Sequence, residues 1–227
     1  MSAGTADRRS ARRERRRRLG QNFLSFEHAE RIVADLGFRP GDLVVEIGAG
    51  AGAFTGALAR RGLRVIAVEL DPLHARALRA RFGDRGQGSV RVVEADFLLL
   101  ALPEEPFRVV GSLPFARTTD VLRRLLDDPG LPLARADLVV QWEVARKRAA
   151  APPDTLLSSV WAPWWEIGLG PRIPAAAFRP IPAVDAGLLT IRKRRPPLLP
   201  LAMARPYARF VRARWPFAPS DERDARR

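Results

Sequence analysis

Residues 43–52 read Leu43-Val44-Val45-Glu46-Ile47-Gly48-Ala49-Gly50-Ala51-Gly52. The first half is a short apolar run with two valines at its centre, a pattern typical of a strand that is buried on both faces of a sheet. The second half alternates glycine with alanine, which lets the backbone turn tightly and lets a ligand approach the start of the next helix. The stretch therefore predicts a strand, a glycine turn and a helix, which together form the first unit of an α/β fold.

The rest of the chain repeats this alternation of strand and helix. The first expected helix has Ser25 as its N-cap and ends at Gly37. Further helices are expected at about Phe54–Arg61, from Pro72 onward, at Thr119–Leu126, at Glu143–Ala149 and at Tyr207–Trp215. Further strands are expected at Arg64–Glu69, Val90–Glu94, Arg108–Gly111, Asp137–Trp142, Trp164–Leu169 and Gly187–Arg192. This order predicts an α/β fold with a mostly parallel central sheet that is covered on both faces.

Composition excludes several classes of protein. The chain has 227 residues, of which 47% are hydrophobic, enough for a full domain with its own core. With no cysteine and two histidines, it is not a disulfide scaffold, a zinc finger or a thiol enzyme, and we expect no metal site and a cytoplasmic location. Apolar runs such as Phe97–Leu102 are too short to cross a membrane. We expect no signal peptide, because the basic N-terminus leads into Gly-Gln-Asn.

The positive charge is concentrated at the N-terminus. The formal net charge is +14, and residues 8–18 hold eight arginines and one glutamate. One interpretation is a solvated tail. We favour a disordered arm over residues 1–18 that binds the phosphates of a nucleic acid, because an extended polycation gains free energy when it releases counterions. The RNA-binding residues of this arm are then expected to be Arg12, Arg13, Arg15, Arg16, Arg17 and Arg18.

Two acids follow later strands at the same expected edge of the sheet. Glu69 lies about twenty residues after the glycine turn, where it can accept hydrogen bonds from both hydroxyls of a ribose. Asp96 follows the third strand, where it can accept from an adenine amino group. The alternative is a pair of solvated strand-end acids. We favour S-adenosylmethionine (SAM) over a dinucleotide, because Glu46 also precedes the turn and carboxylates attract a sulfonium but repel a pyrophosphate.

The fourth strand leads into Gly111-Ser112-Leu113-Pro114-Phe115, which suits a flipped nucleobase. The Phe115 ring can stack on a purine, while the Ser112 hydroxyl and the Pro114 carbonyl can accept hydrogen bonds from its exocyclic amine. Because that amine is a poor nucleophile, two acceptors would orient its lone pair toward a methyl donor. The alternative is an ordinary proline-containing loop with Phe115 in the core.

Other polar and aromatic residues carry weaker signals. The five tryptophans are expected in the core or at a domain junction rather than on nucleobases. A short basic run, Arg146-Lys147-Arg148, fits either a phosphate contact or a solvated helix face. Glu143 and Asp185 are expected to be structural.

Several segments in a fixed order together resemble one protein family. They are Gly20-Gln21-Asn22-Phe23-Leu24, Glu46–Gly50, Val68–Asp71, Asp96, Gly111–Phe115 and Phe178–Asp185. From about Leu19 to Arg194 the chain resembles the SAM-dependent rRNA adenine N6-methyltransferases, which include the Erm-type resistance enzymes and the KsgA-type ribosome-maturation enzymes. The resemblance implies a Rossmann-like SAM-dependent methyltransferase fold.

The resemblance also implies two groups of site residues. SAM would be bound by Gln21, Asn22, Leu24, Gly48, Gly50, Glu69, Leu70, Asp96 and Ser112, with Asp96 at its adenine ring. The target adenine would be held by Ser112, Leu113, Pro114, Phe115 and Phe178, with Phe178 over the second face of the base.

Two features depart from the family pattern. Ser112 stands where the family usually has asparagine; its hydroxyl can still accept a hydrogen bond, and we expect a reduced rate or a preference for one methyl transfer over two. Only 32 residues follow Arg195, where family members usually carry a helical domain. We therefore expect a catalytic domain at 19–195, a short proline-rich helical segment at 196–227, and a larger part for the arm in holding RNA.

The Arg-rich arm before Gly20 and the segment Pro114–Leu126 favour the Erm-type branch. That branch implies mono- or dimethylation of one adenine in 23S rRNA by a monomer, on naked RNA or an early assembly intermediate, and resistance to macrolides, lincosamides and streptogramin B. The alternatives are a KsgA-type enzyme acting on 16S rRNA and a non-catalytic rRNA-binding relative. A measurement of SAM binding discriminates the last of these.

Overall fold

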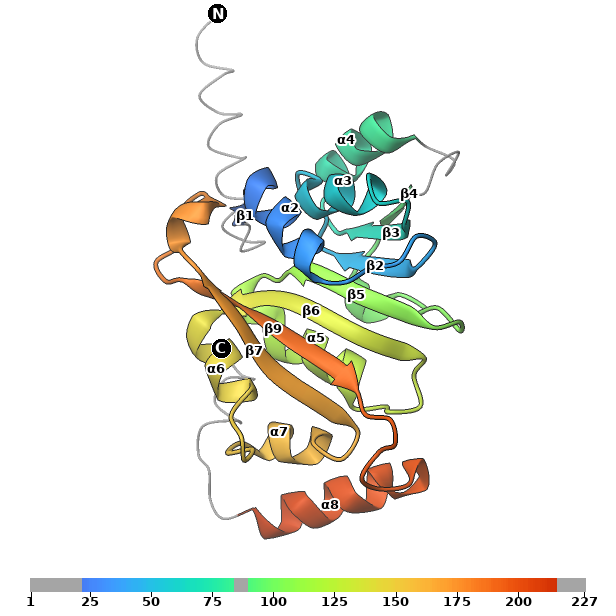
Figure 1. Ribbon diagram of the computed structural model, residues 1–227, viewed down its shortest axis with the longest axis vertical. Helices are drawn as coiled ribbons and strands as arrows, with labels where there is room; N and C mark the ends of the chain where they lie inside the picture. The colour runs from blue at the N-terminus through green and yellow to red at the C-terminus, as the bar shows by residue number, and fades with distance from the viewer. Residues whose placement is uncertain (1–21, 84–89, 216–227) are drawn as a thin grey trace, which may run out of the picture.

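The computed structural model describes residues 22–83 and 90–215, which are built around a seven-stranded sheet (Figure 1). Its strands are β2 (Leu43–Ile47), β3 (Arg64–Glu69), β4 (Val90–Glu94), β5 (Phe107–Ser112), β6 (Leu133–Gln141), β7 (Trp165–Ile173) and β9 (Ala186–Lys193). They lie in the order β4-β3-β2-β5-β6-β9-β7. The first five are parallel, and β9 is antiparallel to both of its neighbours. The predicted α/β class with a mostly parallel sheet is confirmed.

Helices cover both faces of the sheet, so the protein has two cores. Successive strand residues point to opposite faces, and Val44 and Val45 of β2 accordingly belong to different cores. One face is covered by α2 (Phe26–Asp35), α3 (Ala53–Ala59) and α4 (Pro72–Phe82). The other face is covered by α5 (Thr118–Leu126), α6 (Trp142–Arg148), α7 (Leu156–Trp161) and α8 (Ala204–Arg214). Burial on both sides explains the continuous apolar sequence of β2.

Two of the expected helix starts, those of α2 and α4, are confirmed by their caps. The Ser25 hydroxyl accepts a 3.3 Å hydrogen bond from the backbone N–H of His28 at the start of α2. Asp71 caps α4 by accepting from the N–H of Leu73 at 2.9 Å, and Pro72 follows it in the first turn. These side chains satisfy backbone donors that have no partner within the helix.

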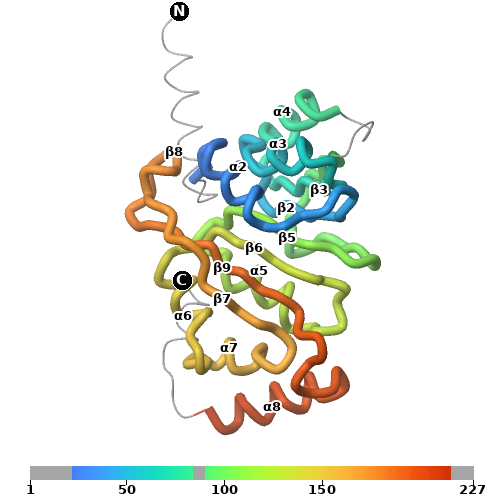
Figure 2. Tube along the Cα trace, viewed as in Figure 1, coloured from blue at the N-terminus to red at the C-terminus, as the bar shows by residue number. Residues whose placement is uncertain are grey.

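A second, two-stranded sheet was not predicted. β1 (Phe23–Leu24) pairs antiparallel with β8 (Phe178–Arg179), and the backbone N–H of Ser25 donates to the carbonyl of Ala177 at 2.9 Å. The chain trace in Figure 2 shows these two segments side by side. Two-residue strands are too short to show a hydrophobic periodicity in the sequence. Their pairing depends instead on contact between distant parts of the chain. The pairing brings Asn22–Leu24 and Phe178 to one place.

Three tryptophans between the end of α7 and the start of β7 are in the core, as expected. Trp161 and Trp165 are each 1% exposed and Trp164 is 3% exposed. Their indole N–H groups donate to Asp127, to the carbonyl of Leu126 and to the carbonyl of Leu199, respectively. Helix α7, which carries Trp161, was not among the predicted elements.

Helix α8 lies where the sequence predicts a C-terminal helix, displaced from Tyr207–Trp215 to Ala204–Arg214. The ring of Tyr207 meets that of Trp164 edge to face at 5.8 Å between centroids, and Val211 is buried. The helix therefore docks beneath α7 (Figure 1). A 3-10 turn, Leu201–Met203, precedes it.

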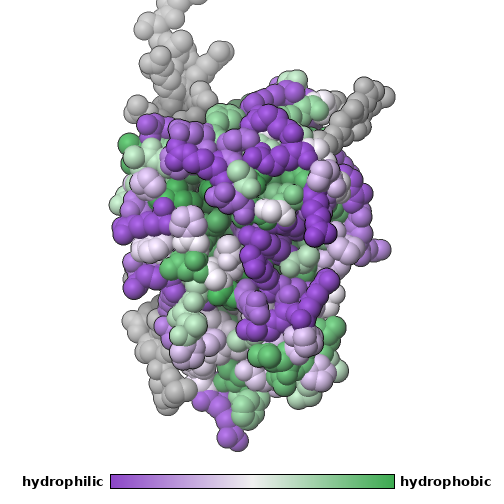
Figure 3. Space-filling view, viewed as in Figure 1, coloured by the Kyte–Doolittle hydropathy of each residue, from purple (hydrophilic) through white to green (hydrophobic). Residues whose placement is uncertain are grey.

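The face drawn in Figure 3 is strongly hydrophilic around α2 and α3. Arginines of this region are paired: the exposed Arg31 with Glu27, and the exposed Arg60 and half-buried Arg61 with Glu30. Across residues 22–83 and 90–215, the helices are all too short or too polar to traverse a lipid bilayer.

Candidate active site

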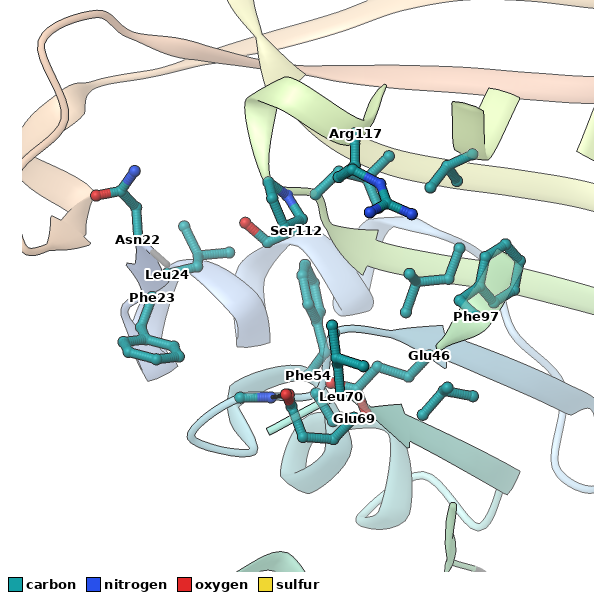
Figure 4. Close-up of a pocket in the computed structure, with 18 of the residues that line it drawn as sticks. Asn22, Phe23, Leu24, Glu46, Phe54, Glu69, Leu70, Phe97, Ser112 and Arg117 are labelled. Carbon is teal, nitrogen blue, oxygen red and sulfur yellow. Dashed lines mark hydrogen bonds between the residues drawn. The ribbon is translucent and has the colours of Figure 1, made fainter. Parts of the chain in front are cut away.

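A cavity of about 310 Å³ opens at the carboxyl ends of β2, β3 and β5 (Figure 4). All the predicted site residues that the structure describes line it: Asn22, Leu24, Gly48, Gly50, Glu69, Leu70, Asp96, Ser112, Leu113, Pro114, Phe115 and Phe178. Gln21 and the arginines of the arm lie outside the described residues. The structure thus gathers side chains that are spread over about 150 positions of sequence into one site, as expected where parallel strands end at one edge.

The glycine turn is held against the end of β3. The N–H groups of Gly48 and Ala49 donate to the carbonyl of Val68 at 2.9 and 3.1 Å. Gly50 has a φ of +53°, and a Cβ at this position would lie 2.7 Å from the ring of Phe23. Only glycine fits here, because a side chain would be strained and would also clash with that ring.

Glu69 connects the end of β3 to this turn. Its Oε2 accepts from the N–H of Gly50 at 2.6 Å, and its Oε1 accepts from the N–H of Asp71 at 2.7 Å. The residue is 4% exposed, yet it lines the cavity. A carboxylate oxygen can accept two hydrogen bonds, so each oxygen of Glu69 has capacity left for one ribose hydroxyl.

Glu46 has a different role from the one expected. It is 1% exposed and accepts from the N–H of Thr55 at 3.1 Å and its hydroxyl at 2.6 Å. Burial raises the pKa of its carboxyl to about 8, the hydrogen bonds from Thr55 opposing the shift. Glu46 is therefore mainly neutral at pH 7. The expectation that its charge attracts a sulfonium is wrong; it instead fastens the start of α3 to β2.

Asp96 follows β4 and begins a 3-10 turn, Phe97–Leu99. Its Oδ1 accepts from the N–H of Leu98 at 2.9 Å, and its Oδ2 lies 3.5 Å from the guanidinium of Arg117. Phe97 is 5% exposed and lines the cavity beside it. A carboxylate next to apolar walls suits a purine with an exocyclic amine.

The segment after β5 is fixed at both ends. The N–H of Leu113 donates to the carbonyl of Val139 at 3.0 Å, and the N–H of Arg117 donates to the carbonyl of Pro114 at 2.9 Å. Leu113 is buried, whereas Ser112, Pro114 and Phe115 are partly exposed and face the cavity. The alternative in which Phe115 belongs to the core is wrong.

Phe178 reaches the same cavity from β8 and is 1% exposed. Asp185 anchors the segment that carries it, accepting from the N–H of Ala175 and from Arg172, each at 2.8 Å. The hydrogen bond from Ala175 lowers the pKa of Asp185, and Arg172 adds to the effect. The structural role expected for Asp185 is confirmed.

The basic run on α6 is largely engaged within the protein. Arg148 is 7% exposed and donates to the Thr155 hydroxyl at 3.0 Å, so a phosphate contact from it is excluded. Arg146 is exposed and pairs with Glu143 at 3.0 Å.

Several residues that line the cavity were not predicted as site residues from the sequence. They are Phe23, Phe54, Phe97, Leu98 and Arg117. A signal existed only for the first and third, since Phe23 lies within the Gly20–Leu24 motif and Phe97 directly follows Asp96.

The groups that line the cavity match the chemical groups of SAM. Its volume is that of a small-ligand pocket. The missing side chain at Gly50, the capacity left on Glu69 and the Oδ2 of Asp96 offer a close backbone approach, a ribose site and an adenine site. Figure 4 shows Asn22 and Leu24 on one side, Ser112 and Arg117 on another, and Glu69 and Leu70 below.

Comparison with known proteins gives consistent matches. Residues 12–215 match the family model described as ribosomal RNA adenine dimethylase. The chain is 38% identical to an rRNA adenine N-6-methyltransferase of Corynebacterium diphtheriae over 192 residues, 85% of this chain and 74% of that protein. It is 41% identical to the mycinamicin-resistance protein MyrB of Micromonospora griseorubida over 198 residues, 87% of this chain and 62% of MyrB.

A solved structure agrees. The crystal structure of the 23S rRNA methyltransferase ErmE superposes with a TM-score of 0.73 at 32% identity, covering 84% of this chain and 78% of that one. The methyltransferase fold implied by the sequence motifs is thereby confirmed. The chain belongs to the ribosomal RNA adenine dimethylase family of SAM-dependent rRNA adenine N6-methyltransferases.

Proposed function

We propose that this chain methylates N6 of an adenine in 23S rRNA with SAM as the methyl donor, and that it confers resistance to macrolides, lincosamides and streptogramin B. One observation carries the proposal: the described residues expected to bind SAM and those expected to hold the target base line one continuous cavity. The names of MyrB and of ErmE, both similar over most of this chain, support resistance and 23S rRNA.

The cofactor half of the cavity is formed by the glycine turn and two acids. Glu69 accepts from the ribose hydroxyls while Gly50 and Asp71 hold it in place. Asp96 accepts from the adenine amine through Oδ2, which has more capacity than Oδ1 because Oδ1 already accepts a 2.9 Å hydrogen bond from the N–H of Leu98. When bound, SAM supplies an electrophilic methyl group. No metal is needed for such a transfer.

The base half is formed by Ser112–Phe115 and Phe178. Phe115 and Phe178 stack on the two faces of a flipped adenine, and Ser112 Oγ and the Pro114 carbonyl accept from its amine. The Pro114 carbonyl already accepts from Arg117, which fixes its direction and leaves one lone pair free. These acceptors orient the N6 lone pair, so catalysis is chiefly positioning.

The decisive experiment is methyl transfer from labelled SAM to naked 23S rRNA and, separately, to naked 16S rRNA, with the modified base mapped afterward. We expect label at one adenine of 23S rRNA. Label on 16S rRNA alone would assign the chain to the maturation branch. SAM binding without label on either RNA would support a non-catalytic rRNA-binding protein.

The remaining expectations are part of the same proposal. We propose that the chain acts as a cytoplasmic monomer on naked rRNA or on an early assembly intermediate, and that the arm at 1–18 contributes RNA affinity. Residues 19–195 are proposed as the catalytic domain, with 196–227 as a short helical appendage.

A further inference from the structure

Arg117 stands out among the residues that line the cavity. Of the described lining residues it is the one with a basic side chain, in a site that also carries Glu46, Glu69 and Asp96. It lies at the end of the short 3-10 turn Phe115–Arg117, two positions after the expected stacking ring. Its side chain is 47% exposed, so it faces both the cavity and solvent.

Arg117 is only loosely held. One guanidinium nitrogen lies 3.5 Å from Oδ2 of Asp96 and another lies 3.5 Å from Oδ2 of Asp120. The Asp120 side chain is 57% exposed. Ion pairs of this length and exposure are weak, so a stronger anionic ligand can take Arg117 from either partner.

Asp96 cannot serve Arg117 and the cofactor equally well. Its Oδ1 already accepts from the N–H of Leu98 at 2.9 Å, whereas Oδ2 has only the longer contact with Arg117, so Oδ2 is the oxygen with more capacity for the adenine amine. That same oxygen is the one nearest to Arg117. When the adenine amine of the cofactor donates to Oδ2, it shares that oxygen with Arg117 and therefore weakens the ion pair between Asp96 and Arg117.

We propose that Arg117 is a phosphate-binding residue that changes partner: it pairs with Asp96 before the cofactor binds, and it binds a phosphate of the substrate RNA once the cofactor adenine has engaged Asp96. The inference rests on the proposed function and goes beyond it by making SAM and RNA binding mutually favourable. A guanidinium suits this task, because its planar fork forms two parallel hydrogen bonds to a phosphate. The phosphates that flank a flipped nucleotide stay outside the base pocket, and Arg117 combines a partly exposed side chain with a position two residues after Phe115.

The test measures RNA affinity with and without S-adenosylhomocysteine, an unreactive cofactor product. The probe is a fluorescein-labelled RNA hairpin with one unpaired adenine. Its binding to the full chain is measured by fluorescence anisotropy. We expect the wild-type chain to bind the probe about fivefold more tightly with the product bound, the lower end of usual coupling between sites. In Arg117→Gln we expect weaker RNA binding and no effect of the cofactor product on RNA affinity. The salt dependence of RNA binding should fall by roughly one released counterion.

Two further variants sharpen the result. Arg117→Lys keeps the charge but not the fork, so it should retain part of the coupling. Asp96→Asn removes the charge that holds Arg117, so RNA affinity without cofactor product should rise. The matched control is Arg31→Gln, since Arg31 is also an exposed, ion-paired arginine but does not line the cavity; it should leave both affinities and their coupling as in the wild type.

Calorimetry with S-adenosylhomocysteine on each variant separates the possible failures. If Arg117→Gln binds RNA with wild-type affinity and coupling, the proposal is overturned while the proposed function stands. If that variant instead loses affinity for the cofactor product, Arg117 contacts the cofactor and the proposal is again overturned. If the wild-type chain binds no cofactor product at all, the proposed function itself fails.

Discussion

The backbone N–H of Gly50 donates a 2.6 Å hydrogen bond to Oε2 of Glu69, and this bond joins the glycine turn to the end of β3. Gly50 belongs to the turn after β2, and Glu69 ends β3. The same carboxylate also accepts from the N–H of Asp71. Glu69 therefore shapes the turn and, as we propose, binds the ribose, so the two roles are linked in one side chain.

Replacement of Glu69 by glutamine should weaken both the fold and cofactor binding. The amide places an N–H₂ group against one of two backbone N–H donors, which costs about 1–3 kcal/mol of stability. We expect affinity for S-adenosylhomocysteine to fall by about tenfold or more, as when one charge-assisted bond of about 1.4 kcal/mol is lost. Calorimetry and urea unfolding measure the two effects.

Glu94→Gln is the matched control for this substitution. Glu94 is the register partner of Glu69 on the adjacent strand, but it is exposed and pairs with Arg79. It should change cofactor affinity by less than about twofold, since exposed pairs contribute little. Equal losses in both variants would argue that general charge at this edge, not the position of Glu69, governs binding.

Gly50→Ala should abolish cofactor binding, whereas Gly62→Ala should not. Both glycines have a positive φ, +53° and +68°, so each alanine costs about 1–2 kcal/mol of backbone strain. Only at Gly50 does the new Cβ meet another group, the ring of Phe23 at 2.7 Å, whereas nothing lies within 4 Å at Gly62. Urea unfolding and calorimetry on both variants check this. Unchanged cofactor affinity in Gly50→Ala would show that the turn yields without disturbing the site.

The sequence predicted well those elements whose signal is local. The bounds of β2, β3 and β4 agree with the prediction, and for β2 the reason is that a strand buried on both faces is a short apolar run. The glycine turn and the acids at strand ends followed from the same logic, since parallel strands present their carboxyl ends at one edge.

What the sequence could not predict depends on contacts between distant residues. The pairing of Leu24 with Phe178 requires two short segments, more than 150 residues apart in the sequence, to meet as a separate two-stranded sheet. The protonation of Glu46 depends on its complete burial, and the pairing of Arg117 with Asp96 depends on how two loops approach each other. None of these has a periodicity or a spacing that could reveal it.

Stability should fall as pH rises from about 4.5 to 8 because of Glu46. Its pKa is about 8 in the folded protein against 4.5 for the free group, so within this window the folded state holds a proton that the unfolded chain has released. The stabilising effect of that proton is complete at low pH and lost above the folded-state pKa. Glu46→Gln stays neutral at every pH and can still accept from Thr55.

We therefore expect Glu46→Gln to gain stability over the wild type as pH rises, by an amount on the order of a few kcal/mol between pH 5 and pH 9. Urea unfolding of both proteins at these pH values gives the difference, in which shared titrations such as that of buried Asp137 cancel. The exposed Glu166→Gln serves as control and should show no such trend. A pH-independent difference would mean that Glu46 is ionised in the folded protein.

Deletion of residues 1–18 should weaken RNA binding and reduce its salt dependence, because the deleted segment carries eight arginines and two acids, or +6 of the net charge of +14. Affinity for S-adenosylhomocysteine should stay within about twofold, since the residues proposed to bind SAM begin at Gln21, outside the deleted segment. Anisotropy titrations at several salt concentrations, with calorimetry in parallel, measure both. An equal loss of cofactor affinity would assign the arm to the cofactor site.

Ser112 tests whether orientation of the target amine limits the rate. Ser112 and Pro114 both line the cavity, so Ser112→Ala removes one of two proposed acceptors while leaving the cofactor acids in place. We expect the rate of methyl transfer to fall by about tenfold, or about 1.4 kcal/mol in barrier height. Ser112→Asn introduces a longer side chain with an acceptor oxygen and should raise both the rate of methyl transfer and the share of dimethylated product.

Single-turnover assays with labelled SAM give the rates, and mass spectrometry of the digested RNA separates mono- from dimethyladenine. If the alanine variant is as fast as the wild type, the hydroxyl has no part in positioning the base, and the Pro114 carbonyl with the two rings must suffice.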